Sequence, residues 1–128
     1  MISIKRVYEP SVPSDGIRFL VERLWPRGMR KESLRMNAWL KDIAPSGTLR
    51  RWFNHDPAKW TEFQRRYFAE LKQQRDALQP ILDAEIHGNV TLLYSAHDTE
   101  HNNAVALKAH LARVRGARVR YANRRRPT

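Results

Sequence analysis

The chain has 128 residues, of which 24 are Lys or Arg, 13 are Asp or Glu and none is Cys. This length fits one domain, and the lack of cysteine excludes disulfide scaffolds, zinc ribbons, iron–sulfur clusters and thiol nucleophiles. No apolar run approaches the roughly 20 residues of a membrane span, and the first residues lack the apolar core of a signal peptide. We therefore expect a cytoplasmic protein with no membrane partner.

Two strands are predicted near the start of the chain. Residues 2–8 form the first, and a loop with two prolines and an Asp-Gly turn follows. Residues 17–22 form the second, and their consecutive apolar side chains suggest burial on both faces of a sheet. The chain leaves this strand through residues 23–28, where Pro26 and Gly28 indicate a turn.

The middle of the chain carries helical patterns. Apolar residues at helical spacing predict a helix over residues 33–43 that Pro45 stops. A short helix capped by Ser46 follows, and Asp56-Pro57 then starts a helix that runs to about residue 78. Residues 81–86 form a shorter helical piece that closes at Gly88.

The last third contains the clearest strand, residues 90–94. Asp98 can cap the helix that follows it, and Gly116 is expected to stop that helix. Residues 118–121 alternate like a short edge strand. Buried strands separated by long helical segments predict an α/β class, namely a single domain with a small, mainly parallel sheet flanked by helices.

The carboxyl ends of such strands are where ligands gather, so residues 23–31 and 95–102 are expected to meet there. In the first segment, Arg23, Arg27 and Lys31 would hold a phosphate or carboxylate, and Trp25 would form a wall beside it. The alternative is structural. Trp25 would then seal the end of the sheet, while Arg23 pairs with a core acid such as Asp15 or Glu22.

The second segment adds Asp98, His101 and Asn102 at a helix start, whose free N–H groups favour anions. Asp98 or His101 could carry a proton, and Asn102 could bind the ligand. The structural alternative makes Asp98 a plain helix cap. His97 and His101 are a weak metal half-site, and a triad with Ser95 lacks the nucleophile-elbow motif, so we expect no metal and no cofactor.

The positive charge gathers at the C-terminal end. Residues 1–100 hold 16 Lys and Arg against all 13 acids, whereas residues 101–128 hold 8 Lys and Arg and no acid. We therefore divide the chain into a domain, residues 1–116, and a basic extension, residues 117–128. Concentrated arginine attracts nucleic acid, although a solvated tail is the alternative. The candidate nucleic-acid residues are Arg118, Arg120, Arg124, Arg125 and Arg126.

Several sequence blocks carry a family resemblance. They are the Trp-Pro-Arg-Gly block at 25–28, the Ala-Pro-Ser block at 44–46, the His-Asp-Pro block at 55–57, and residues 90–94 with Asp98 and 101–105. The chain resembles the YeaO-like proteins, a bacterial family of unknown function. The resemblance implies a small cytoplasmic α/β protein and no particular reaction.

Two hypotheses for function follow from these patterns. In the first, the protein binds, or acts as an enzyme on, a small anionic ligand bearing phosphate or carboxylate, at the edge where the two polar segments meet. In the second, it binds nucleic acid through its basic surface and arginine-rich tail, without sequence-specific reading, because no helix-turn-helix or RNA-binding signature is present.

Overall fold

A computed structural model describes residues 1–125 of the chain, with side chains described for residues 1–116. Four strands form one sheet: β1 (Ile2–Arg6), β2 (Ile17–Leu20), β3 (Ala38–Trp39) and β4 (Val90–Tyr94). Their order is β1-β4-β2-β3, and every neighbouring pair is parallel. The predicted α/β class with a small parallel sheet is confirmed.

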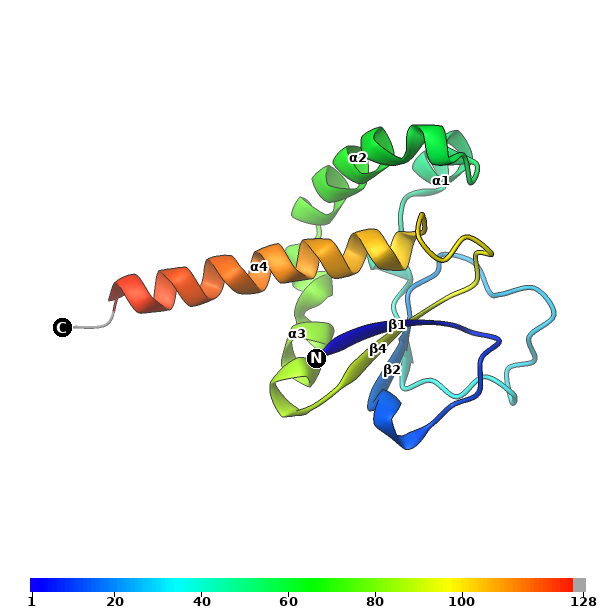
Figure 1. Cartoon of the computed structure of the whole chain (residues 1–128), viewed down its shortest axis with the longest axis horizontal. Helices are drawn as coiled ribbons and strands as arrows, with labels where there is room; N and C mark the ends of the chain where they lie inside the picture. Colours follow the sequence, from blue (N-terminus) through cyan, green and yellow to red (C-terminus); the bar gives the residue numbers. More distant parts are fainter. Residues whose placement is uncertain (126–128) are drawn as a thin grey trace.

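Four helices accompany the sheet: α1 (Gly47–Phe53), α2 (Trp60–Lys72), α3 (Gln79–His87) and α4 (Asn103–Arg125). In Figure 1 the loops that follow β1, β2 and β4 all lie at one end of the sheet, while α4 extends past the other end. No helix within residues 1–125 is long and apolar enough to span a bilayer. Short 3₁₀ turns connect these elements at Pro13–Asp15, Lys41–Ile43, Pro57–Lys59 and Arg75–Leu78.

Both faces of the sheet are covered, as the apolar strands predicted. On one face, Phe19 and Leu92 pack with residues of the helices such as Phe63 and Leu107. On the other face, Leu20 and Leu93 form a smaller cluster. The loop that follows β2, together with strand β3, covers this second face with buried and half-buried side chains, which are Trp25, Met29, Leu34, Met36 and Trp39.

The predicted helix over residues 33–43 is wrong. Its central residues, Ala38 and Trp39, pair with Phe19 and Leu20 as strand β3, and the N–H of Leu40 donates to the carbonyl of Leu20 at 2.8 Å. The apolar side chains mimic helical spacing because the extended segment packs some of them, such as Leu40, into the core on one face of the sheet and others, such as Met36, into the cluster on the other face. Tertiary strand pairing therefore outweighs local spacing here.

Two helix ends also differ from expectation. The helix that begins near residue 57 ends at Lys72, before the 3₁₀ turn at Arg75–Leu78. Helix α4 continues through Gly116 to Arg125, so the predicted stop and the edge strand at residues 118–121 are wrong. A single glycine costs a helix only about 1 kcal/mol, and α4 carries residues 118–121 away from any sheet edge (Figure 1). The domain boundary at residue 116 stays a prediction.

Candidate functional site

The two polar segments start side by side at the carboxyl edge of the sheet. The main-chain N–H of Ser95, just after β4, donates to Glu22 Oε1 at 2.9 Å. Asn103, the first residue of α4, donates from Nδ2 to the carbonyl of Val21 at 2.6 Å. Because β2 and β4 are parallel neighbours, the loops that follow them start side by side.

The first segment uses most of its side chains to hold itself together. Arg23 donates from Nε to the carbonyl of Pro45 at 2.9 Å and from a terminal nitrogen to that of Ala44 at 3.0 Å. Trp25 donates from Nε1 to the carbonyl of Met29 at 2.6 Å and is half-buried. Arg23 therefore anchors the chain ahead of α1 through carbonyl groups, and the structure shows no ion pair for it with a described acid.

Arg27 and Lys31 lie on the exposed part of the same loop. The Tyr8 hydroxyl donates to the carbonyl of Arg27 at 2.8 Å, which anchors the backbone there. Among the residues whose side chains are described, neither Arg27 nor Lys31 has an ion pair. These two cations are thus available to an anion, but from a solvated position where single contacts contribute little.

The second segment is closed by its own caps. Asp98 Oδ1 accepts from the N–H groups of Glu100 and His101, both at 2.9 Å, and these bonds lower the pKa of the Asp98 carboxyl. Buried Asn102 donates to the carbonyl of Asp98 and accepts from the N–H of Val105. The N–H groups that would attract an anion at this helix start are therefore largely satisfied by the chain.

The Asp98 and His101 side chains form a pair that still reaches solvent. Asp98 Oδ2 lies 2.9 Å from His101 Nδ1, and each side chain is about one-third exposed. The His101 ring meets Trp60 edge-on, with centroids 5.3 Å apart. Ser95 Oγ lies 3.4 Å from Glu22 Oε1, and the structure shows no Ser95–His101 hydrogen bond that a triad would use. His97 is exposed.

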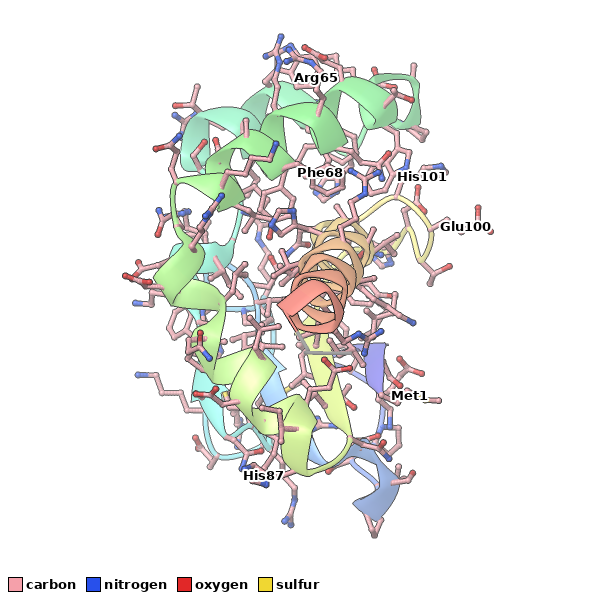
Figure 2. The ribbon with its side chains drawn as sticks, turned by 90° about the vertical axis from the view of Figure 1, so that its left-hand side faces the viewer. Met1, Arg65, Phe68, His87, Glu100 and His101 are labelled. Atoms are coloured by element: carbon pink, nitrogen blue, oxygen red, sulfur yellow. The ribbon has the colours of Figure 1, made fainter. Side chains whose placement is uncertain are left out.

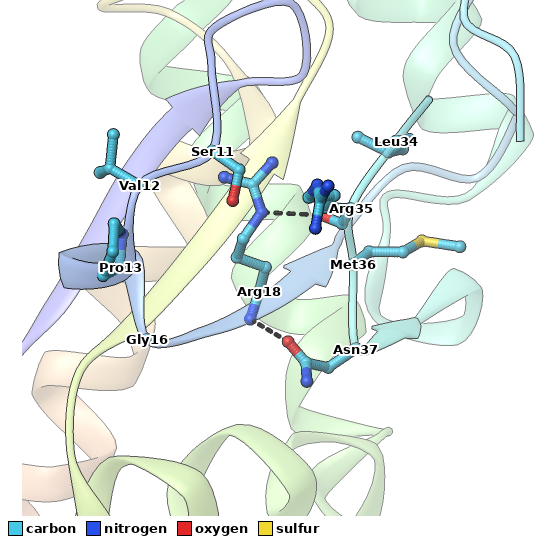
Figure 3. Close-up of a pocket in the computed structure, with 9 residues that line it drawn as sticks. All are labelled: Ser11, Val12, Pro13, Gly16, Arg18, Leu34, Arg35, Met36 and Asn37. Atoms are coloured by element: carbon cyan, nitrogen blue, oxygen red, sulfur yellow. Dashed lines mark hydrogen bonds between the residues drawn. The ribbon is translucent and has the colours of Figure 1, made fainter. Parts of the chain in front are cut away.

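A different place, beside β2, presents a buried cation. Arg18 is only 5% exposed, although it stands in an apolar strand. Its guanidinium donates to Asp15 Oδ2 at 2.5 Å and to the carbonyl of Arg35 at 2.6 Å, and its main-chain N–H donates to Asn37 Oδ1 at 2.8 Å. Figure 3 shows the last two of these bonds, which hold Arg18 from both ends.

Asp15 is shared between two cations. It accepts from Lys5 Nζ at 3.1 and 3.2 Å as well as from Arg18. Burial alone would raise the pKa of the Asp15 carboxyl, but the hydrogen bonds from the Val12 N–H, Lys5 and Arg18 lower it. One carboxylate thus serves two positive side chains, and the cluster keeps a net positive charge.

A hollow of about 700 Å³ opens over this cluster. Arg35 lies at its side with its side chain exposed and with no ion pair to a described residue. Because Asn37 Oδ1 is used by Arg18, the Asn37 amide nitrogen can act as a donor. No described residue that lines the hollow is acidic; the lining comprises Ser11, Val12, Pro13, Gly16, Arg18, Leu34, Arg35, Met36 and Asn37 (Figure 3).

Sequence reasoning missed this hollow. Arg18, Arg35 and Asn37 were not among the predicted site residues. The one available signal was Arg18 itself, because an arginine inside an apolar strand is seldom buried without a special partner. The alternative partner suggested for Arg23, Asp15, proved to be the partner of Arg18.

Fold and hollow together define a class of protein: a small, all-parallel α/β domain with a basic surface hollow beside its second strand. The model of the DUF488-N3i family, described as the inactive DUF488-N3 subclade, matches residues 1–125. The chain belongs to this family.

The chain is also similar in sequence to individual proteins. The chain is 42% identical over 106 residues to the uncharacterised protein YeaO of Escherichia coli, which covers 83% of this chain and 92% of YeaO. It is 49% identical over 70 residues to the uncharacterised proteins Rv3073c of Mycobacterium tuberculosis and Mb3100c of Mycobacterium bovis, covering 55% of this chain and 59% of each relative. No solved structure matches the chain. The predicted YeaO-like membership is confirmed.

Proposed function

We propose that this protein binds a small anionic ligand, bearing phosphate or carboxylate, in the hollow beside β2. The observation that carries the proposal is Arg18, a nearly buried guanidinium that is fixed by Asp15 and the Arg35 carbonyl and borders an open hollow with no acid in its lining. A guanidinium held in place loses little freedom on binding, and its planar donors match phosphate and carboxylate oxygens.

Binding fits this hollow better than catalysis does. Its described lining residues include no His, Cys, Asp or Glu that could act as a general base or thiol nucleophile. The description of the family as an inactive subclade favours the same choice. An enzyme would instead use the Asp98–His101 pair at the carboxyl edge, with His101 as the proton carrier.

The test is a phosphate and citrate titration followed by backbone amide NMR shifts. We expect shifts centred on residues 11–18 and 34–37, and about a tenfold weaker affinity in Arg35→Gln, the effect of removing ~1.4 kcal/mol of binding. Arg30→Gln removes the same charge from an exposed site on the same loop and serves as the control. Shifts that gather around Arg27 and His101 instead, or an equal effect of both substitutions, would contradict the proposal.

Nucleic-acid binding remains the second candidate function. The observation favouring it is that α4 carries the arginine-rich end of the chain out beyond the sheet (Figure 1). The side chains of Arg118, Arg120, Arg124 and Arg125, and all of Arg126, lie outside the described residues. A helix that projects beyond the sheet suits contact with phosphates on one face of a duplex.

Affinity for mixed-sequence DNA, measured at several salt concentrations, tests this second function. Deletion of residues 117–128 should abolish most of the binding and flatten its salt dependence. Equal affinity of the shortened and full chains would exclude it. Phosphate binding beside β2 should survive the deletion, which separates the two functions.

A further inference from the structure

A second hollow opens on the helical side of the molecule. It lies between α2, the 3₁₀ turn at Arg75–Leu78, α3 and α4, and has a volume of about 730 Å³. Figure 2 views the molecule from this side, with α4 seen end-on and Phe68 on the side of α2 that faces it. The lining residues are Arg65, Phe68, Ala69, Lys72, Arg75, Leu78, Leu82, His110, Arg113 and Val114.

The charged part of this lining is wholly positive. Arg65, Lys72, Arg75 and Arg113 are exposed and line the hollow, and no described lining residue is acidic. Arg65 is paired with Glu62 at 2.5 Å. Within the part of the chain whose side chains are described, Lys72 and Arg75 have no ion pair. Two cations without an ion pair therefore line the same hollow.

The floor of the hollow is apolar and aromatic. Phe68 stacks on His110 with centroids 5.5 Å apart, and the Arg113 guanidinium lies 4.9 Å from the centre of the Phe68 ring. Leu82 and Val114 add aliphatic surface beside them. An inorganic ion would leave this surface wet, whereas an organic ligand would cover it.

His110 is the unusual member of the floor. It is only 6% exposed, yet no described residue forms a hydrogen bond with its ring. Neither ring nitrogen is sealed from solvent, and the residue lines the hollow. With no described partner, the His110 ring can offer a donor or an acceptor to a bound molecule.

The protonation of His110 depends on the cations around it. Burial lowers the pKa of the imidazole, and the charges of Lys72 and Arg113 lower it further. Arg65 and Arg75 also line the hollow, and no described lining residue is an acid that would oppose them. A bound anion would offset the cations and thus raise the pKa of His110.

We propose that this hollow is a binding site for an organic anion with an apolar body, whose carboxylate or phosphate head lies between Lys72 and Arg75 and whose body covers Phe68, Leu82 and Val114. Its volume falls within the range of about 300–1,000 Å³ typical of small-molecule sites. The site shares no residue with the hollow beside β2, so the inference stands independently of the proposed function.

Three probes separate the head of the ligand from its body. Octanoate carries both, acetate carries only the carboxylate, and octanol carries only the chain. We expect octanoate to bind at least about tenfold tighter than acetate, because each buried methylene contributes ~0.8 kcal/mol. Octanol should bind more weakly than octanoate. Calorimetry gives the affinities, and NMR of the His110 ring should show its pKa rise with octanoate.

Variants locate the binding. Lys72→Gln together with Arg75→Gln should lower octanoate affinity about tenfold or more, as expected for two lost charge-assisted contacts. Arg30→Gln with Arg51→Gln removes the same charge from exposed positions elsewhere and should have no effect. Val114→Thr keeps the shape of the side chain and should weaken octanoate but not acetate. Circular dichroism confirms that each variant is folded.

Two results would overturn the inference. Equal affinity for octanoate and acetate would show that the apolar floor takes no part. Octanoate binding that is unchanged by the Lys72 and Arg75 substitutions, with no change in the His110 titration, would place the ligand elsewhere. Phosphate binding beside β2 is measured separately, so either proposal can fail without the other.

Discussion

The main-chain N–H of Ser95 donates to Glu22 Oε1 across 2.9 Å and so ties the end of β4 to the end of β2. Burial raises the pKa of the half-buried Glu22 carboxyl, while the hydrogen bonds from Ser95 and the charge of Arg50 oppose that rise. At the same edge, Arg6 donates to the carbonyls of Ser95 and Ala96. These bonds hold the two loops together where a parallel sheet often leaves room for a ligand.

The packing of α2 onto the sheet can be tested at Phe63. This ring is 2% exposed and stacks on Phe53 with centroids 4.3 Å apart. Phe63→Ala should lower the free energy of unfolding by about 3–5 kcal/mol, because the cavity adds to the lost transfer energy. Urea denaturation measures the change. Ile86→Ala, at a position 78% exposed, should change it by less than about 0.5 kcal/mol. Similar losses at both positions would contradict this packing.

Two glycines with positive φ make a matched pair. Gly16 has φ 66°, and a Cβ there would lie 2.1 Å from the main-chain oxygen of Asn89. Gly28 has φ 73°, but a Cβ there would meet no atom within 4 Å. Gly28→Ala should cost only the left-handed strain, about 1–2 kcal/mol. Gly16→Ala should cost clearly more in the same urea titration, since the backbones of residues 16 and 89 must separate. Equal losses would show that the close approach is absent.

Whether Gly116 lies inside α4 or ends the helix decides the sign of the stability change that Gly116→Ala should cause. If residue 116 lies inside the helix, Gly116→Ala should raise helicity and stabilise the protein by about 1 kcal/mol. If glycine ended the helix in a left-handed conformation, the same change would destabilise it. Circular dichroism and urea denaturation distinguish the two. Ala112→Gly, at an exposed position one turn earlier, should lower stability and helicity.

The sequence predicts the fold class well because a strand that is buried on both faces of a sheet is a run of mostly apolar residues, which can be recognised locally. Four of residues 90–94 are apolar, with Thr91 as the exception, and all five are buried in the central strand β4. Strand β3 is too short to show such a run of apolar residues. It has two residues, and only its pairing with Phe19 and Leu20 makes it a strand. Long-range pairing of this kind cannot be recognised from spacing alone.

The candidate site was harder to predict for a physical reason. Arg23, Trp25 and Asn102 have the chemistry of ligand-binding residues, but their partners are main-chain groups of their own neighbourhood. A sequence shows which groups can donate and accept, and not which of them are already satisfied. Arg18 is the opposite case: it lines an open hollow, but the carbonyl that its guanidinium binds belongs to Arg35, 17 residues further along the chain. That contact cannot be seen in the sequence.

Glu22 should make the free energy of unfolding depend on pH. Because burial raises the pKa of this carboxyl in the folded state, the folded protein holds the proton more tightly than the unfolded chain, whose Glu pKa is about 4.3. The contribution of Glu22 to the free energy of unfolding is therefore greatest when it is protonated. It falls as the pH rises from the unfolded pKa through the raised folded pKa, and stays low above it.

Glu22→Gln tests this sign. The amide oxygen can still accept from the Ser95 N–H, and no charge is buried, so the variant should be at least as stable as the parent near neutral pH. As the pH falls through the raised pKa of Glu22, the parent carboxyl takes up its proton, so the difference should shrink. Urea denaturation across this range gives the two profiles, and Glu32→Gln removes an equal charge from an exposed position as the control. A Glu22→Gln variant that is less stable than the parent at neutral pH would contradict this prediction. The attraction between the ionised Glu22 and Arg50 would then outweigh the cost of burying the carboxylate, and the edge of the sheet would depend on that charge.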